Sequence, residues 1–249
     1  MILTAFTLVA IGGGDLLRRF VPARLARTVL LLLLAAAVIV TGACSDAIIP
    51  AVIGVVIGGA WIWLMPLDAT GRASFWPAVL VAVVATATTA LMPARDEPGV
   101  IGAVWHLPAP DGEIPFDVAI LAVGVVLFVG ESANLIVRAA LDREGTWRPA
   151  EQGGLFRGGQ LRQSPQAATG FQGGRLIGPL ERFLVVVLML AGAYALLAAM
   201  LAAKGIVRFP EISKDGETGA RAEYFLVGSL VSWVVALGAA LLLWWGARV

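Results

Sequence analysis

Three polar residues inside one long apolar stretch have side chains that could do chemistry. Glu131, Asn134 and Arg138 stand at positions i, i+3 and i+7, so a helix would place all three on one face. Glu131 precedes Arg138 by about 10 Å of helix at 1.5 Å per residue, which puts its carboxylate below the headgroups of a bilayer that the stretch crosses. A bare carboxylate at that depth costs several kcal/mol unless it is protonated or paired. Glu131 must therefore face protein or water.

Two arginines are the candidate partners of Glu131. Arg138 shares its helical face, and Arg182 stands at the start of a later apolar stretch, on the same predicted side of the membrane. Glu181 lies about 100° round the helix from Arg182 and would in turn pair with Arg138. Such a buried cluster is open to two interpretations: a proton or cation relay, or an interhelical clamp with no further role.

A second group of charges follows at the other end of that later stretch. Lys204 and Arg208, one helical turn apart, end it, and Glu223 opens the last apolar stretch, in which Ser229 and Ser232 follow. Glu223 could pair with either cation. Lysine and arginine at helix ends reach water without any special role. We therefore favour an interfacial clamp, at the membrane side opposite to the first group.

The elements that would hold these residues are membrane-spanning helices. Of the 249 residues, 59% are hydrophobic and 14% are charged, whereas an ordinary soluble domain is about half apolar and about a quarter charged. A hydrocarbon core about 30 Å thick needs roughly 20 apolar residues per helix. We therefore predict an all-α fold, a polytopic transmembrane helix bundle of six to seven spans. The clearest spans are Thr28–Ala43, Ala47–Met65, Ser74–Met92, Val118–Gly130 continuing towards Arg138, Phe183–Ala203 and Tyr224–Gly246.

The start of the chain would supply the seventh span. Met1–Ile11, extended by three glycines at 12–14, is apolar but short, so we expect a half-span or a tilted helix. A cleavable signal peptide is disfavoured because the arginines follow this run instead of preceding it. Read from Arg18, the segment ending at Cys44 imitates a lipoprotein signal, but Thr41 is a poor residue at its lipobox position. The alternative for this single cysteine is a buried or interfacial thiol.

The lysines and arginines of the short loops predict the orientation, since these residues stay on the cytoplasmic side. With seven spans, the arginines at 18, 19, 24 and 27 fall inside, together with those between residues 142 and 175. The connection that starts at Lys204 is an exception, because it holds four cations and falls outside. We predict an N-terminus outside and a C-terminus inside, in the cytoplasmic (inner) membrane of a bacterium.

We predict three parts along the chain. Residues 1–139 form an N-terminal membrane region of about five apolar helices, residues 140–176 a flexible cytoplasmic loop rich in Gly, Arg and Gln, and residues 177–249 a C-terminal two-helix membrane region. The loop cannot bury enough apolar area to offset the entropy of ordering. Its arginines could contact anionic lipid or nucleic acid, but aromatic residues are few, so we favour a solvated linker and expect no nucleic-acid partner.

A second connection, at residues 93–115, contains the only histidine. A metal site from His106, Asp111 and Glu113 is an alternative, but a single imidazole makes a weak ligand set for zinc. We favour a short apolar element from Val100 to Leu107 at the membrane surface, and we predict no metal site.

The C-terminal part of the chain resembles a bacterial family of uncharacterised multi-spanning membrane proteins, a domain of unknown function. The resemblance covers about a quarter of the chain and implies a family position for Glu181, Arg182, Lys204, Arg208 and Glu223, but no activity. The segments that carry it are Gly174–Gly178, Leu180–Arg182, Ala202–Lys204, Arg208–Phe209, Glu223–Ser229 and Ser232.

The function predicted is that of a small-solute or ion transporter, chosen narrowly and mainly because transport is a common role of polytopic bacterial proteins; an acid inside a span is compatible with it. The alternative is a non-catalytic accessory or scaffold subunit of a membrane complex, in which the same charges are clamps. A membrane enzyme is the third choice, since no phosphate loop, zinc-protease motif or nucleophile elbow occurs. We predict no catalytic residue and no cofactor, and as partners the lipid bilayer and a membrane protein or second copy of the chain.

Overall fold

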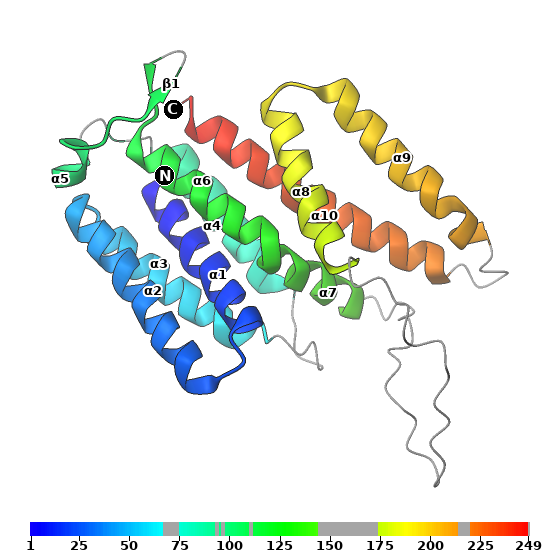
Figure 1. Ribbon diagram of the computed structural model, residues 1–249, viewed down its shortest axis with the longest axis horizontal. Helices are drawn as coiled ribbons and strands as arrows, with labels where there is room; N and C mark the ends of the chain where they lie inside the picture. Colours follow the sequence, from blue (N-terminus) through cyan, green and yellow to red (C-terminus); the bar gives the residue numbers. More distant parts are fainter. Residues whose placement is uncertain are drawn as a thin grey trace, which may run out of the picture.

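The computed structural model describes residues 1–66, 75–92, 95, 98–109, 112–143, 174–213 and 220–248. The prediction of an all-α chain with long apolar helices is confirmed (Figure 1). Within the described residues, three helices are long and apolar enough to cross a membrane: Arg24–Cys44, Phe116–Leu141 and Ala222–Gly246. Shorter apolar helices cover Ile48–Leu64, Trp76–Leu91 and Tyr194–Val207.

Helix α1, Ile2–Phe20, forms the centre of the bundle and packs against α3 (Ile48–Leu64) and α6 (Phe116–Leu127). The expected half-span is therefore a complete helix of 19 residues. The glycines continue it because they allow close packing: a Cβ on Gly12 would lie 2.6 Å from the backbone carbon of Leu127 and from the backbone nitrogen of Phe128. The arginines at 18 and 19 consequently belong to the last turn of α1 and not to a loop.

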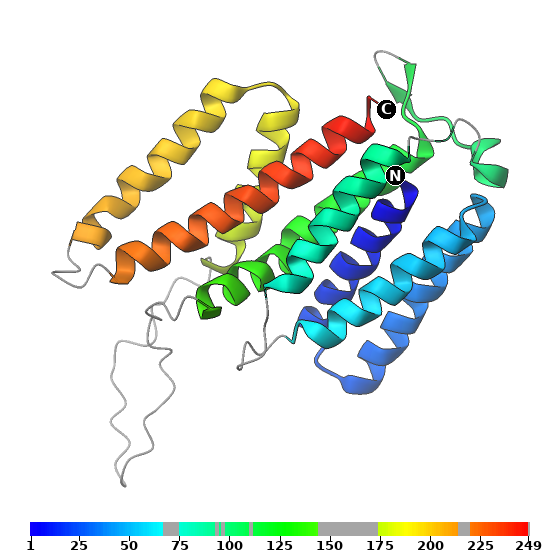
Figure 2. The ribbon, with the colours of Figure 1, turned by 180° about the vertical axis from the view of Figure 1, so that it is seen from behind.

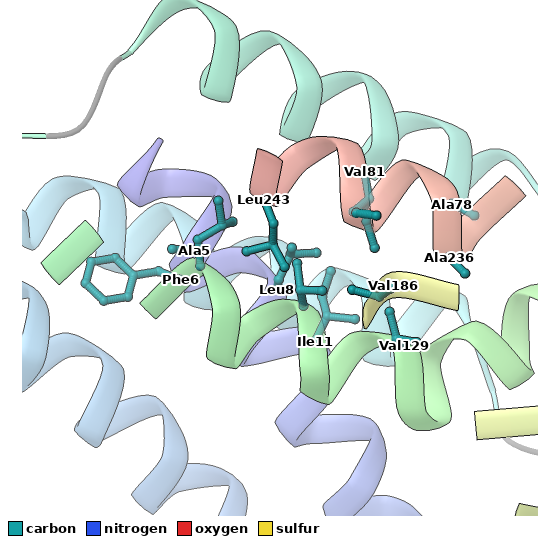
Figure 3. Packing of buried hydrophobic residues seen from close by; sticks show 14 of the residues in the cluster. Ala5, Phe6, Leu8, Ile11, Ala78, Val81, Val129, Val186, Ala236 and Leu243 are labelled. Carbon is teal, nitrogen blue, oxygen red and sulfur yellow. The ribbon is translucent and has the colours of Figure 1, made fainter. Parts of the chain in front are cut away.

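The hydrophobic core surrounds α1 and joins it to the C-terminal helices. Figure 3 shows side chains from α1, α4 (Trp76–Leu91), α8 (Gly174–Leu190) and α10 (Ala220–Gly246) meeting there. In contrast, α2 (Arg24–Cys44) buries only two of its residues, Val38 and Gly42. The exposed apolar face of α2 is what a lipid-facing helix presents.

One end of the bundle carries the described part of the connection between α4 and α6. It holds the short helix α5 (Gly99–Gly102) and two antiparallel strands, β1 (Pro108–Ala109) and β2 (Gly112–Glu113), in which Pro108 pairs with Glu113. Trp105 packs edge-on against Phe116 with ring centroids 5.3 Å apart. Val100 and Val104 remain exposed, as expected of an apolar element at a membrane surface.

The helix from α6 to α7 (Ala133–Arg143) is continuous but contains a π-helical turn, η1, at Phe128–Ser132. This turn lies beside α1 and α8, which both pack against it. A π-helix bonds each N–H to the fifth preceding carbonyl instead of the fourth, and such turns are frequent at functional sites. The predicted span from Val118 through Gly130 towards Arg138 is therefore a continuous helix, with a wider turn near its middle.

The predicted span Phe183–Ala203 is wrong, because the structure divides it into α8 and α9 (Tyr194–Ser213). Gly192 has φ of +68°, a conformation that favours glycine. The N–H of Ala193 donates to the carbonyl of Leu188 at 2.9 Å, and that of Gly192 to Met189 at 3.2 Å. These two bonds form a Schellman motif, the common termination of a helix at glycine. The C-terminal region consequently has three helices instead of the two predicted.

Both chain termini lie at the same end of the bundle (Figures 1 and 2). We call this the termini end, and the opposite one, where α7 ends and α8 begins, the α7–α8 end. The α2–α3 and α8–α9 turns are at the termini end, and the ends of α1 and α9 are at the α7–α8 end. The predicted arrangement, with the two termini on opposite sides, therefore differs from the structure. The additional helix break adds one crossing of the bundle.

Candidate functional site

The π-helical turn η1 provides backbone oxygens for a buried arginine from another helix. Arg182 of α8 donates from Nε to the carbonyl of Val129 at 2.9 Å and from Nη2 to that of Gly130 at 3.0 Å. Its Nη2 also donates to Oδ1 of Asn134 at 2.5 Å, and its Nη1 to Oγ of Ser232 at 3.3 Å. Arg182 is only 2% exposed. The guanidinium thus joins α8 to the π turn, α7 and α10.

The predicted direct pairing of Glu131 with Arg182 is wrong, since an amide lies between them. Asn134 donates from Nδ2 to Oε2 of Glu131 at 3.1 Å while its oxygen accepts from Arg182. In the described part of the chain, no carboxylate lies within ion-pair distance of Arg182. Neutral oxygens therefore hold this cation directly, and Glu131 is linked to it through Asn134.

The ion-pair partner of Glu131 is Arg19 of α1. The distance from Arg19 Nε to Oε1 of Glu131 is 3.6 Å, which exceeds a hydrogen bond, and that oxygen is buried without a hydrogen-bond partner. The predicted partner Arg138 is partly buried, and among the described residues it has no ion pair with Glu131 or Glu181. The prediction failed because α1 is longer than expected and brings its last turn to η1.

A second acid, Asp15 of α1, contacts Ser132, the residue that follows Glu131 in η1. Ser132 donates to Oδ2 of Asp15 at 2.6 Å, Trp61 Nε1 donates to the same oxygen at 2.9 Å, and Arg18 binds the other oxygen. Arg18 also donates from Nη1 to the carbonyls of Ile62 and Met65, at 3.0 Å each, and thereby satisfies the C-terminal end of α3. Asp15 is completely buried and completely paired.

The third acid, Glu181 of α8, pairs with Lys204 of α9. Lys204 Nζ lies 2.6 Å and 2.7 Å from the two carboxylate oxygens, and Trp233 of α10 donates to one of them at 3.0 Å. The Nζ also lies 5.5 Å from the ring centroid of Trp233 and 5.9 Å from that of Phe225. The prediction placed Glu181 and Lys204 on opposite sides of the membrane. The α8–α9 hairpin brings them together.

The other two predicted residues of the second group do not join this cluster. Glu223 is exposed near the start of α10, and the described residues offer it no ion pair, so its predicted pairing with Lys204 is not observed. The side chain of Arg208 lies outside the described part of the structure, although its backbone belongs to α9.

Together these contacts form one polar layer through the bundle. It is defined by Asp15, Arg18, Arg19, Trp61, Glu131, Ser132, Asn134, Glu181, Arg182, Lys204, Ser232 and Trp233. At 1.5 Å per residue, Arg182 lies about 12 Å from either end of α8, and Glu131 about 18 Å from the end of α7. Glu131 and Arg182 therefore lie well inside the bundle, whereas Arg18 and Arg19 reach the layer from the last turn of α1.

A separate cluster occupies the termini end. Arg95 binds both oxygens of Asp117, at 2.9 Å and 3.1 Å, and donates to the carbonyl of Ser45 at 2.6 Å. His106 and Glu113 form an exposed pair at 3.4 Å. Asp111, the third member of the alternative metal site, lies outside the described residues. Within the part of the chain that is described, no group of three His, Cys, Asp or Glu side chains could hold a metal ion.

The sequence-based prediction omits Asp15, Arg18 and Arg19, which form one side of the polar layer. A signal was available: the first fourteen residues carry no charged side chain, and Asp15 then stands three residues before Arg18, the spacing of a helical ion pair. Ser132 and Trp61 had no comparable signal, since serine and tryptophan are ordinary residues in membrane helices.

Comparison with known proteins adds no identification. No protein-family model, no curated protein and no solved structure matches the chain.

Proposed function

We propose that this chain is a multi-pass membrane transport protein for a small solute or an ion, and that the polar layer is its translocation site. The observation that carries the proposal is Glu131, a carboxylate inside the bundle whose Oε1 has only a loose ion pair at 3.6 Å and no hydrogen bond. Ionisable residues at membrane depth are costly and typically mark ion or substrate pathways. A purely structural acid is expected to be paired as completely as Asp15.

The proposed orientation places the α7–α8 end in the cytoplasm. Among the lysine and arginine residues that the structure describes, Arg95 and Arg248 belong to the termini end. The other described ones belong to the layer or to helix ends at the α7–α8 end, as positive charge on the cytoplasmic side requires. The connection between α9 and α10 is then no exception. We infer a bacterial cytoplasmic membrane, in line with the family resemblance, and both termini outside.

The parts of the layer suggest how a path would open. Arg182 is held by two backbone oxygens of η1 and stays fixed, whereas Arg19 is 30% exposed and meets Glu131 loosely. Separation of Arg19 from Glu131 would expose the carboxylate towards the cytoplasmic end. On the other side of the layer, α9 packs less closely on the bundle than α8 does, and Lys204 supplies its polar link, so α9 is the element best able to move.

The test is charge movement across vesicles that contain the purified chain. Solid-supported membrane electrophysiology would apply jumps of H⁺, Na⁺, K⁺ and Cl⁻, one at a time, to vesicles of phosphatidylethanolamine and phosphatidylglycerol. We expect a current for at least one ion, lost in Glu131→Gln and retained in Glu113→Gln, which alters an exposed acid on β2. An absence of current for all four ions, or an unchanged current in Glu131→Gln, would contradict the proposal.

One observation favours the accessory-subunit alternative: the charged residues of the layer other than Glu131 and Arg19 are hydrogen-bonded to neighbouring helices. Asp15, Glu181 and Arg182 have all their contacts within the chain, as interhelical clamps would. This alternative predicts that native purification in mild detergent yields a stoichiometric partner and that the isolated chain carries no current. Recovery of the chain alone, together with a current, would exclude it.

A further inference from the structure

Two buried acids lie at the π-helical turn η1, Glu131 within it and Asp15 in contact with its Ser132, and they differ in how completely their oxygens are hydrogen-bonded. Asp15 is 0% exposed and accepts from Trp61, Ser132 and Arg18, so both of its oxygens are bound. Glu131 is 8% exposed, yet only Oε2 accepts a hydrogen bond, from Asn134 at 3.1 Å. Its Oε1 is buried and unsatisfied. An unsatisfied carboxylate oxygen in a low-dielectric interior is unfavourable, because it has lost its water without gaining a donor.

The charged groups around Glu131 do not remove this deficit. From α1, Arg19 is 3.6 Å away, while Arg18 and Asp15 are occupied with one another. From α8, Arg182 reaches Glu131 only through Asn134, and Glu181 is bound to Lys204. On the helix of Glu131 itself, Arg138 makes no ion pair among the described residues, and α10 contributes the neutral Ser232.

We infer that Glu131 is a proton-binding site and that its Oε1 takes up a proton from the α7–α8 end. This inference deepens the proposed function by naming H⁺ as a transported or coupling ion, although proton binding itself is measurable without transport. A hydronium ion gives up one proton, a new O–H bond forms on the carboxylate, and water leaves. The carboxyl becomes neutral, which removes the cost of a charge at this depth, and the Arg19 ion pair is lost.

The surroundings provide the direction of entry. Arg19 lies in the last turn of α1 and is 30% exposed, so its guanidinium can leave Glu131 for water at the same end. Arg182, on the opposite side of Glu131, is buried and anchored to Val129 and Gly130. Asn134 remains within reach in both protonation states, because its amide can donate to a carbonyl or a carboxylate oxygen. The proton therefore replaces Arg19 and not Arg182.

Infrared spectroscopy of the full chain in lipid vesicles tests this directly. A protonated carboxyl has a C=O stretching band that a carboxylate lacks, and a carboxyl shielded from water absorbs at higher frequency than a hydrated one. As the pH is lowered, we expect a high-frequency band that shifts in D₂O, is absent in Glu131→Gln and is present at wild-type size in Glu113→Gln. A second variant, Glu131→Asp, keeps a titratable carboxyl and is expected to retain a band at a displaced frequency.

The outcomes separate this inference from the proposed function. A band that depends on Glu131, in vesicles that carry no ion current, would support proton binding and contradict transport. A current without such a band would support transport and overturn the proton site. If Glu131→Gln does not fold, a band at unchanged frequency in Glu131→Asp would also overturn it, because the band would then belong to another acid.

Discussion

The α1-centred bundle and the α8–α9 hairpin are held in place by different forces. Phe6 and Ile11 of α1 are almost fully buried, and its glycines bring it into backbone contact with the α6–η1 junction. In α9, by contrast, Leu197 is the buried hydrophobic residue, and Lys204 supplies its polar link to α8. The comparison shows that apolar packing and close backbone contact hold α1, whereas α9 has less apolar packing and is linked to α8 by a partly exposed ion pair. Helix α9 is therefore the more easily displaced.

The largest effect is expected from Gly12→Leu, which breaks the packed region. Any side chain at Gly12 would meet the backbone at Leu127 and Phe128, which cannot move aside cheaply. We expect a loss of about 3 kcal/mol or more of unfolding free energy, measured as thermal unfolding and monodispersity in detergent. Gly205→Leu is the matched control, because nothing lies within 4 Å of a Cβ there. Equal unfolding temperatures for the two variants would contradict the account.

A somewhat smaller effect is expected where the two regions meet, at Arg182→Met. Two carbonyls of η1, the oxygen of Asn134 and Ser232 all lose a donor. Since each unsatisfied buried group costs about 1–3 kcal/mol and some will find new partners, we expect about 2–4 kcal/mol of destabilisation. Arg24→Met on the exposed start of α2 is the control. A variant as stable as the control would show that the arginine does not hold the π turn.

Lys204→Met should loosen the hairpin with little effect on the α1-centred bundle. Glu181 then keeps a buried charge with only Trp233 as donor, at an expected cost of about 1–2 kcal/mol for this partly exposed pair. Hydrogen exchange should accelerate in α9 and remain unchanged in α1. Adding Glu181→Gln should recover part of the loss, because the unpaired charge is removed. Uniform acceleration in both helices would argue against two separately held regions.

The smallest of these effects is expected at the termini end, from Arg95→Met. Asp117 is fully buried and would lose a bidentate partner, but Arg95 is 31% exposed, so water can enter the space that its guanidinium leaves and hydrate the carboxylate; we therefore expect about 1 kcal/mol. His106→Gln, which alters only an exposed pair, should leave the unfolding temperature unchanged. The measurement is thermal unfolding of both variants in the same detergent. A larger loss for His106→Gln than for Arg95→Met would reverse the assigned roles.

Hydropathy and buried charge predicted much of this molecule, because both follow directly from the cost of polar groups in lipid. The apolar helices and the positions of Glu131 and Arg182 inside the bundle could be predicted in that way. The hairpin at Gly192 could not, since a helix break within an apolar stretch leaves hydropathy unchanged. The sequence contains Gly192, the residue type that a Schellman motif favours. This glycine could not identify the break, because glycine also occurs within membrane helices.

The ion-pair partners were beyond sequence reasoning for a related physical reason. The partner of a charged residue depends on which helices are neighbours. If one membrane crossing is missed, every later residue is predicted at the opposite end of the bundle. Lys204 was assigned to the wrong side for this reason, and Arg19 was assigned to a loop because α1 was expected to end early.

The α8–α9 hairpin is the central claim, and cysteine labelling tests it most directly. Ala191→Cys, in a Cys44→Ala background, places a single thiol at the exposed turn between the two helices. We predict that a membrane-impermeant maleimide labels it in intact cells from the side of the termini end, whereas Ala236→Cys, buried within α10, stays unlabelled. Protection of Ala191→Cys both in intact cells and in inside-out membrane vesicles would mean that residues 183–203 cross as one helix, and would contradict the polar layer described above.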